Sequence, residues 1–221
     1  AATTGENAVL NGDVTPGTVG QDSDPDGDTL TVTAVNGVGA NVGSDVTGSA
    51  GGTFNIAANG SYSFDPGTAF DDLAVGESRV TTVTYTISDG EGGTDVATVT
   101  ITVTGVNDAP VPADDTFIVG EDNSVTIDVL SNDNDPDGDL LTITEVDGAL
   151  IVDRGPPVTV ANGSVSLIGG KLVFTPDINY VGPATFTYTV TDGTVNSTAA
   201  VSGQVLPHND APVAVADVVT T

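Results

Sequence analysis

The sequence predicts an all-β protein made of two tandem antiparallel β-sandwich domains. Three observations support this prediction. Apolar and polar residues alternate along short segments, turn residues separate these segments, and several blocks of sequence occur twice in the same order. The length of 221 residues fits two domains of ordinary size, and no segment has the apolar period of 3.6 residues that an amphipathic helix shows.

The recurring blocks define the domain organisation. The paired blocks are 5–7 with 120–122, 21–35 with 132–146, 84–90 with 187–193, and 106–110 with 208–212. Because the order is kept, we expect two homologous modules. The predicted boundaries are a first domain over 1–106, a second over 107–207, and, over 208–221, a linker followed by the first strand of a truncated third repeat.

The alternation within each module indicates strands with one buried and one exposed face. Val83, Tyr85 and Ile87 alternate with threonine, and segment 98–104 shows the same period of two. Asn-Gly pairs are typical of hairpin turns, and we expect turns at 11–12, 36–37, 59–60 and 162–163. Many short strands with such frequent turns predict sandwiches of the immunoglobulin type.

The charge balance excludes several classes of function. Acidic residues outnumber basic ones 31 to 3, for a formal net charge of −28, so we expect no nucleic-acid partner and no direct insertion into a membrane. The chain has no Cys and a single His. Thiolate sites, disulfides and a Ser-His-Asp triad are therefore excluded, and we expect no enzyme activity.

Two runs of aspartate carry the chemistry that the sequence makes visible. The first contains Asp22, Asp24, Asp26 and Asp28, and the second contains Asp133, Asp135, Asp137 and Asp139. Carboxylates this close repel one another, and Ca²⁺ converts that repulsion into binding because it takes six to eight oxygen ligands from such loops. The alternative is a metal-free turn rich in Asp and Gly. An EF-hand is not expected, because the twelfth position is Thr33 or Thr144 instead of Glu and no flanking helices are predicted.

Topology predicts that further acids lie near each Asp run. In an immunoglobulin-type sandwich the B–C and F–G loops lie at the same end, where the preceding module also enters. The Asp runs belong in the B–C loop, whereas Asp89 and Asp192 precede the last strand and belong in the F–G loop. We therefore expect Asn107 and Asp108 of the linker to lie near Asp133, Asp135 and Asp192.

The motifs also resemble known families. Segments 59–64, 73–77 and 85–94 are similar to the VCBS repeat of large bacterial surface proteins. Segments 113–117, 121–122 and 132–139 together resemble the cadherin-like repeat of repeats-in-toxin (RTX) adhesins. The resemblance implies immunoglobulin/cadherin-like sandwiches and Ca²⁺ as the cofactor. By similarity to cadherins, the residues implied to bind Ca²⁺ at the linkers are Glu6, Asn107, Asp108, Glu121, Asp133, Asp135, Asp192, Asn209 and Asp210. The sequence departs from cadherins in having no Asp-Arg-Glu motif.

We therefore predict a calcium-binding extender region of a bacterial cell-surface adhesin, located outside the cell. Its partners are neighbouring repeats of the same polypeptide, and Ca²⁺ stiffens the connection between them. One alternative is a self-assembling filament in which segment 213–219 adds a strand to a neighbouring molecule. The other alternative is a module that recognises a glycan or a protein.

Overall fold

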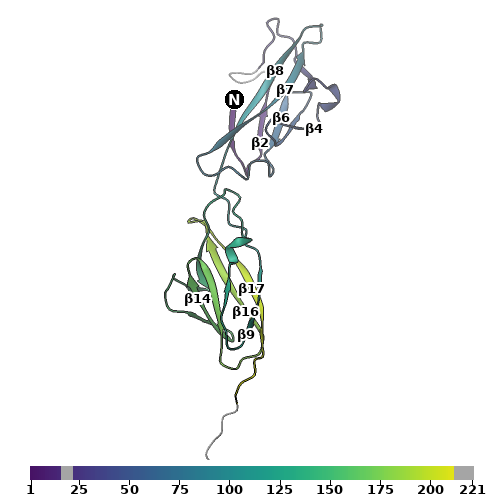
Figure 1. Ribbon diagram of the computed structural model, residues 1–221. Helices are drawn as coiled ribbons and strands as arrows, with labels where there is room; N and C mark the ends of the chain where they lie inside the picture. Colours follow the sequence, from purple (N-terminus) through teal and green to yellow (C-terminus); the bar gives the residue numbers. More distant parts are fainter. Residues whose placement is uncertain (16–21, 212–221) are drawn as a thin grey trace, which may run out of the picture. The chain divides into compact units, whose positions relative to one another are not determined.

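The computed structural model describes residues 1–15 and 22–211 and contains two compact units (Figure 1). The first unit comprises Ala1–Asp108 with Pro136–Gly138, and the second comprises Ala109–Asp135 with Asp139–Thr221. Each unit holds two β-sheets and its own buried apolar cluster. The prediction of an all-β protein with two β-sandwich domains is confirmed.

The first unit is a sandwich of two four-stranded sheets. One sheet has the order β1-β8-β7-β3 and the other the order β2-β6-β5-β4. The strands span Ala2–Gly5 (β1), Leu10–Asp13 (β2), Thr31–Val35 (β3), Asp45–Thr47 (β4), Thr53–Ile56 (β5), Ser61–Asp65 (β6), Ser78–Ser88 (β7) and Thr94–Thr104 (β8), and a short 3₁₀ helix, η1, spans Gly39–Asn41.

The second unit packs a five-stranded sheet on a four-stranded one. The sheet orders are β12-β11-β16-β17-β9 and β10-β15-β14-β13. The strands span Asp115–Gly120 (β9), Val125–Ile127 (β10), Thr142–Val146 (β11), Ala149–Leu150 (β12), Val158–Val160 (β13), Gly163–Ile168 (β14), Lys171–Pro176 (β15), Gly182–Thr191 (β16) and Asn196–Leu206 (β17), and the 3₁₀ helix η2 spans Val129–Ser131.

The expectation of purely antiparallel sheets is wrong for the first strand of each unit. β1 pairs parallel with β8, and β9 pairs parallel with β17, whereas the other strand pairs are antiparallel. Alternation alone reveals which residues face the core, but it carries no information about strand direction. The parallel pairs put the beginning and the end of each unit side by side.

Aromatic side chains fill the centre of both sandwiches. In the first unit, the rings of Phe54 and Phe64 have centroids 4.6 Å apart, and both side chains are fully buried. In the second unit, the rings of Phe117 and Phe174 are 4.9 Å apart, and Phe186 packs beside them. These rings belong to the buried apolar clusters of the two units.

Three of the four predicted Asn-Gly turns are confirmed, and one is wrong. Asn36, Gly37, Gly60 and Asn162 hold positive φ angles at these turns. Asn11-Gly12, in contrast, lies inside β2. Gly12 is needed there because a β-carbon would come within 2.4 Å of the Tyr62 ring. This glycine therefore serves a close approach and not a turn.

Two further expectations concern membrane-spanning segments and the strand expected near the end of the sequence. No helix in the described ranges is long and apolar enough to cross a membrane. The strand expected at 213–219 lies outside the described residues.

Candidate metal centre

The second Asp run forms a loop that tyrosine and the backbone hold in place. The run lies between η2 and β11. The hydroxyl of Tyr188, a buried residue of β16, donates to both carboxylate oxygens of Asp133, at 2.8 and 3.0 Å. The backbone N–H of Ala113 donates to Asp133 Oδ1 at 2.8 Å. Asp133 is therefore fixed at the start of the loop by two donors, the Tyr188 hydroxyl and the Ala113 N–H.

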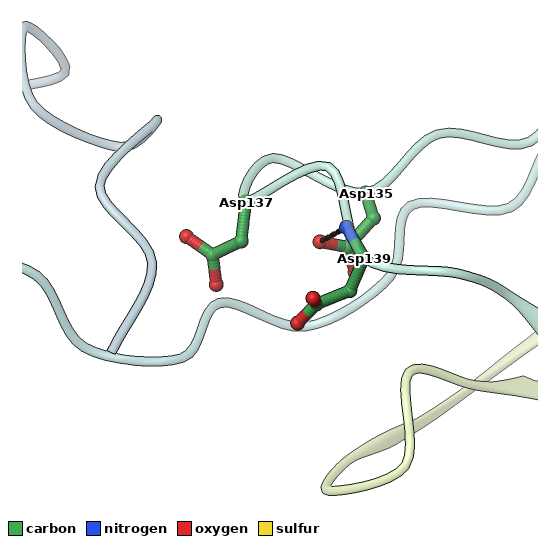
Figure 2. A group of neighbouring side chains, drawn as sticks. All are labelled: Asp135, Asp137 and Asp139. Carbon is green, nitrogen blue, oxygen red and sulfur yellow. Dashed lines mark hydrogen bonds between the residues drawn. The ribbon is translucent and has the colours of Figure 1, made fainter. Parts of the chain in front are cut away.

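Three carboxylates of the loop lie close enough together to bind one cation. Ligand oxygens of Asp135, Asp137 and Asp139 all lie within 4.8 Å of one another (Figure 2). Asp135 is only 6% exposed, and its Oδ1 accepts a hydrogen bond of 3.2 Å from the Asp139 backbone N–H. Within residues 1–15 and 22–211, this is the one group of three or more acidic or His side chains that meets the 4.8 Å spacing. Such a set of hard oxygen donors matches the preference of Ca²⁺.

Glu6 is a second buried carboxylate, positioned by the end of β1. It is 1% exposed, and its Oε1 accepts a hydrogen bond of 2.6 Å from the backbone N–H of Val106. Its Oε2 is buried and has no hydrogen-bond partner in the described part of the chain. Burial raises the pKa of Glu6, and the nearby charges of Asp108, Asp137 and Asp71 raise it further, although the Val106 hydrogen bond opposes them. A cation beside Oε2 would remove this penalty.

Asp108 and Asp137 lie in the same unit as Glu6. The backbone N–H of Asp108 donates to Asp137 Oδ2 at 2.8 Å. The amide of Asn107 donates to the backbone carbonyl of Asp108 at 2.8 Å, which shapes the segment after β8. We call Glu6, Asp108 and Asp137 the first pole. Its three carboxylates offer oxygen ligands to a cation. No basic residue is among the groups that shift the pKa of Glu6.

The second unit has an arrangement that matches the one around Glu6. It lies after β9 and β17, and we call its residues, Glu121, Asp122, His208, Asn209 and Asp210, the second pole. Glu121 follows β9, is 8% exposed, and accepts a hydrogen bond of 2.6 Å from the backbone N–H of His208. His208 Nδ1 lies 3.1 Å from Asp122 Oδ2. Asn209 donates to the carbonyl of Asp210 at 3.3 Å, as Asn107 does to Asp108. The matching contacts show that the repeated sequence blocks build the same local structure twice.

The first Asp run is organised differently from the second. The Tyr85 hydroxyl donates to Asp22 Oδ2 at 2.6 Å, which reproduces the tie between Tyr188 and Asp133. Asp24 Oδ1 accepts from the backbone N–H groups of Asp26 and Asp28, at 2.8 and 3.3 Å. Asp22, Asp24, Asp26 and Asp28 form no group with the 4.8 Å spacing found in the second run, among the residues described. The first run is a turn that its own backbone closes.

The acids of the two F–G loops cap their own turns. Asp89 Oδ1 accepts from the backbone N–H groups of Glu91, Gly92 and Gly93, at 2.8 to 3.0 Å. Asp192 Oδ1 accepts from those of Thr194 and Val195, at 2.5 and 2.7 Å. Both carboxylates therefore stabilise the turn between the last two strands of their unit. Their role as metal ligands stays a prediction.

Several residues near the site were not predicted from the sequence. Tyr85 and Tyr188 hold the Asp runs, and the signal for them is that each stands at the same place in a recurring block. Asp71 acts on Glu6 from a turn before β7, and no motif marks it. Asp115 has a buried Oδ2, and burial together with the carboxylates of Asp133 and Asp114 raises its pKa.

Comparisons with known proteins agree with the division into two units. Residues 1–105 match the model of the bacterial cadherin-like domain, and residues 107–203 match that of the bacterial Ig domain. The calcium-binding lectin RapA2 of Rhizobium johnstonii is 33% identical over 144 residues, which is 64% of this chain. The matched region spans 57% of that lectin.

Solved structures of low sequence identity also resemble the chain. The human mucin-like protocadherin EC1-2 is 18% identical, with 94% of this chain and 95% of that chain covered and a TM-score of 0.45. Human protocadherin-24 EC1-2 is 17% identical, with 86% and 85% covered and a TM-score of 0.42. On its sequence matches and its own sheets, the chain consists of two β-sandwich domains, the first matching the bacterial cadherin-like domain and the second the bacterial Ig domain.

Proposed function

We propose that the chain is a calcium-binding structural module of a bacterial surface adhesin, in which bound Ca²⁺ stiffens the link between neighbouring domains. The observation that carries the proposal is Glu6, a buried carboxylate whose Oε2 has no hydrogen-bond partner among the described residues. A buried charge without a partner is costly unless a cation or proton neutralises it. The acidic group of Asp135, Asp137 and Asp139 supports the same ligand.

The proposed mechanism is electrostatic. Without a cation, the carboxylates of the first pole repel one another, and this repulsion favours loosening of the segment after β8. When Ca²⁺ is bound, Glu6, Asp108 and Asp137 of the first unit would be its ligands. Stiffening follows because one ion then links segments that are far apart in sequence.

The similarity to known proteins supports the extracellular setting. Bacterial cadherin-like and bacterial Ig domains are typical of secreted and surface proteins, and RapA2 is described as a calcium-binding lectin. We extend this to an extender region of an RTX-type adhesin that carries VCBS-like repeats. The neighbouring repeats of the polypeptide are the proposed partners. We also propose that the chain has no catalytic activity, because one His and no Cys leave few groups for acid–base or nucleophilic chemistry.

A carbohydrate-binding role is the second candidate. The similarity to a lectin favours it, and a surface hollow of about 230 Å³ in the first unit offers a place for a small polar ligand. Leu30 and Ile87 form the apolar part of this hollow, and Asp24, Asp89 and Asp95 bring carboxylates to it. A glycan array in Ca²⁺ tests this role, and a reproducible hit lost on Asp89→Asn would favour recognition over a purely structural function.

One paired experiment tests the structural proposal. The chain lacks Cys, so Val96→Cys and Leu150→Cys introduce two unique labelling sites on exposed strand residues, one in each unit. Spin-label distances are then measured with Ca²⁺ and with chelator, and calorimetry records Ca²⁺ binding to the unlabelled protein. We expect heat of binding and a narrower distance distribution in Ca²⁺. Binding without narrowing would reject the stiffening mechanism, and no heat of binding would reject the calcium site.

A further inference from the structure

Asn36 and Gly37 form the exposed tip of a two-residue hairpin that follows β3. The N–H of Val35 donates to the carbonyl of Val38 at 3.2 Å, and the N–H of Val38 donates back to the carbonyl of Val35 at 3.0 Å. A β-carbon at Gly37 would meet no atom within 4 Å. No hydrogen bond from the Gly37 N–H is found among the described residues. The backbone at this tip is therefore open, and its glycine nitrogen is accessible.

An Asn-Gly pair is chemically labile because glycine has no side chain to shield its own backbone nitrogen. That nitrogen attacks the asparagine Cγ, a new C–N bond forms, and the side-chain nitrogen leaves as ammonia with the proton of the glycine N–H. Water then opens the resulting succinimide ring. Cleavage of the bond to Cγ gives aspartate, and cleavage of the bond to the backbone carbonyl carbon gives isoaspartate. The ring forms only where the nitrogen is free and the backbone can rotate.

The other three Asn-Gly pairs lack this freedom. Asn11-Gly12 lies inside β2 and is paired with β6, and Gly163 lies in β14 between β13 and β15. Gly60 is buried, and its N–H donates to the Ala57 carbonyl at 2.9 Å. A β-carbon on any of these three glycines would come within 2.5 Å of a neighbouring atom. Packing and strand pairing therefore hold their backbones in place.

We propose that Asn36 is a site of spontaneous deamidation, that it reacts before the other Asn-Gly asparagines, and that the folded first unit accepts the aspartate product. The reaction consumes only water, releases ammonia and adds one negative charge to the chain. It does not depend on the calcium site proposed above.

The second unit shows how the fold accommodates aspartate at this position. Asp147-Gly148 is the tip of the equivalent hairpin, after β11, and its φ angles of 48° and 74° match the 47° and 73° of Asn36-Gly37. The Thr187 N–H donates to Asp147 Oδ1 at 2.7 Å, as the Thr84 N–H donates to Asn36 Oδ1 at 3.1 Å. An aspartate at position 36 would keep this contact, because a carboxylate oxygen accepts the hydrogen bond as an amide oxygen does.

The isoaspartate product should behave differently. Its main chain runs through the side-chain methylene, which lengthens the segment between Val35 and Val38 and disrupts their paired hydrogen bonds. Val35 is 1% exposed and belongs to the core of the first unit. We therefore expect the isoaspartate form to melt at a lower temperature than the aspartate form. Thermal unfolding of the two forms, separated by chromatography, measures the difference.

Peptide mapping by mass spectrometry tests the selectivity of the reaction. The folded chain is incubated at mildly alkaline pH below its melting temperature, and a second sample is incubated in denaturant. We expect Asn36 to lose its amide first in the folded sample, and ion exchange to detect the added negative charge. In denaturant the four pairs should react at similar rates, because packing no longer protects three of them. Equal rates in the folded sample, or an unreacted Asn36, would overturn the proposal.

Two matched variants test whether the fold accepts the product. Asn36→Asp introduces the product directly, and Asn162→Asp makes the same change of charge at another hairpin. Asn162 Nδ2 donates to the Pro183 carbonyl at 3.5 Å, and aspartate cannot replace this donor. We expect Asn36→Asp to leave the melting temperature unchanged and Asn162→Asp to lower it. A decrease in Asn36→Asp as large as that in Asn162→Asp would show that the hairpin does not tolerate aspartate.

Discussion

The hydroxyl of Tyr188 donates to both carboxylate oxygens of Asp133, and the same relationship joins Tyr85 to Asp22 in the first unit. In each unit the tyrosine lies on the strand before the F–G loop, and the aspartate begins the Asp run. Burial and the adjacent carboxylate both raise the pKa of Tyr188, so its hydroxyl remains a donor throughout the physiological range. An uncharged donor thus orients the first acid of each run.

Removing the tyrosine hydroxyl should loosen the second Asp run. Hydrogen bonds to charged groups contribute about 1.5–3 kcal/mol, so Tyr188→Phe should lower the free energy of unfolding in chelator by about that amount. It should also weaken Ca²⁺ binding, because the Tyr188 hydroxyl no longer holds Asp133 at the start of the loop. Denaturant unfolding and calorimetry measure the two effects.

Tyr180→Phe is the control for this substitution. Its hydroxyl donates to the Pro183 carbonyl at 2.5 Å, away from the Asp run. This variant should lose a smaller amount of stability, about 0.5–1.5 kcal/mol, and keep the Ca²⁺ affinity. Equal effects of both variants on affinity would contradict the positioning role of Tyr188.

Glu6→Gln should have opposite effects with and without Ca²⁺. Glutamine keeps an oxygen for the Val106 N–H but removes a buried charge that repels Asp108 and Asp137. We therefore expect a higher melting temperature than the unmodified protein in chelator and a lower one in millimolar Ca²⁺. Thermal unfolding under both conditions checks this. A decrease in both would contradict the expectation that repulsion from Asp108 and Asp137 at Glu6 destabilises the metal-free protein.

The raised pKa of Glu6 predicts a specific pH dependence for the metal-free protein. The folded pKa lies above the ordinary value of 4.5, so the folded state binds the proton more tightly than the unfolded state. The stability that protonated Glu6 contributes is complete below pH 4.5 and is lost as the pH rises through the folded pKa. The unfolding free energy of the unmodified protein relative to Glu6→Gln should therefore fall over that interval in chelator. A flat difference would exclude a buried, charge-strained Glu6.

Chelation should lower the melting temperature substantially. Ca²⁺ that binds only the folded state stabilises it by RT ln(1 + [L]/Kd), about 1–2 kcal/mol per site for weak extracellular sites at millimolar Ca²⁺. High salt should restore part of the loss by screening the repulsion of a chain with net charge −28. Differential scanning calorimetry of the same sample in Ca²⁺, in chelator and in chelator with salt measures these differences. Identical melting curves in Ca²⁺ and in chelator would reject the metal site.

The effect of removing one acidic side chain on Ca²⁺-dependent stability should depend on where that side chain lies. Asp135→Ala removes a carboxylate that is 6% exposed and belongs to the three-acid group, so it should reduce the stability gained from Ca²⁺. Asp177→Ala removes an exposed acid outside both poles and should be close to neutral. The Ca²⁺-dependent shift in melting temperature of the two variants gives the comparison. Equal shifts would mean that net charge, and not a specific site, governs the response.

The fold was largely predictable because burial on one face leaves a period-two pattern. Val83, Tyr85 and Ile87 were assigned to a strand, and all three are buried in β7. The direction of β1 and β9 was not predictable, since a parallel and an antiparallel edge strand bury the same alternating residues. Gly12 misled the turn prediction because the Tyr62 ring that requires it is about fifty positions away in sequence.

The candidate site was predictable where ligands recur in motifs and unpredictable where folding brings single residues together. The group of Asp135, Asp137 and Asp139 follows from the spacing of one loop. The two Asp runs look alike in sequence, yet backbone hydrogen bonds to Asp24 close the first one on itself. Asp71 came to the first pole only through the packing of its turn on Gly105, which no local pattern encodes.

The parallel pairing of β1 with β8 has a mechanical consequence. Tension applied to the two ends of the first unit pulls these strands in opposite directions along their axes. The pairing from Ala2↔Ile101 to Gly5↔Thr104 is therefore loaded in shear, and its hydrogen bonds bear the force together. Peeling would load them one at a time. Glu6 extends this clamp by binding the Val106 N–H just beyond the last strand pair. A cation at Glu6 would therefore reinforce the unit at the point where a pulling force enters it.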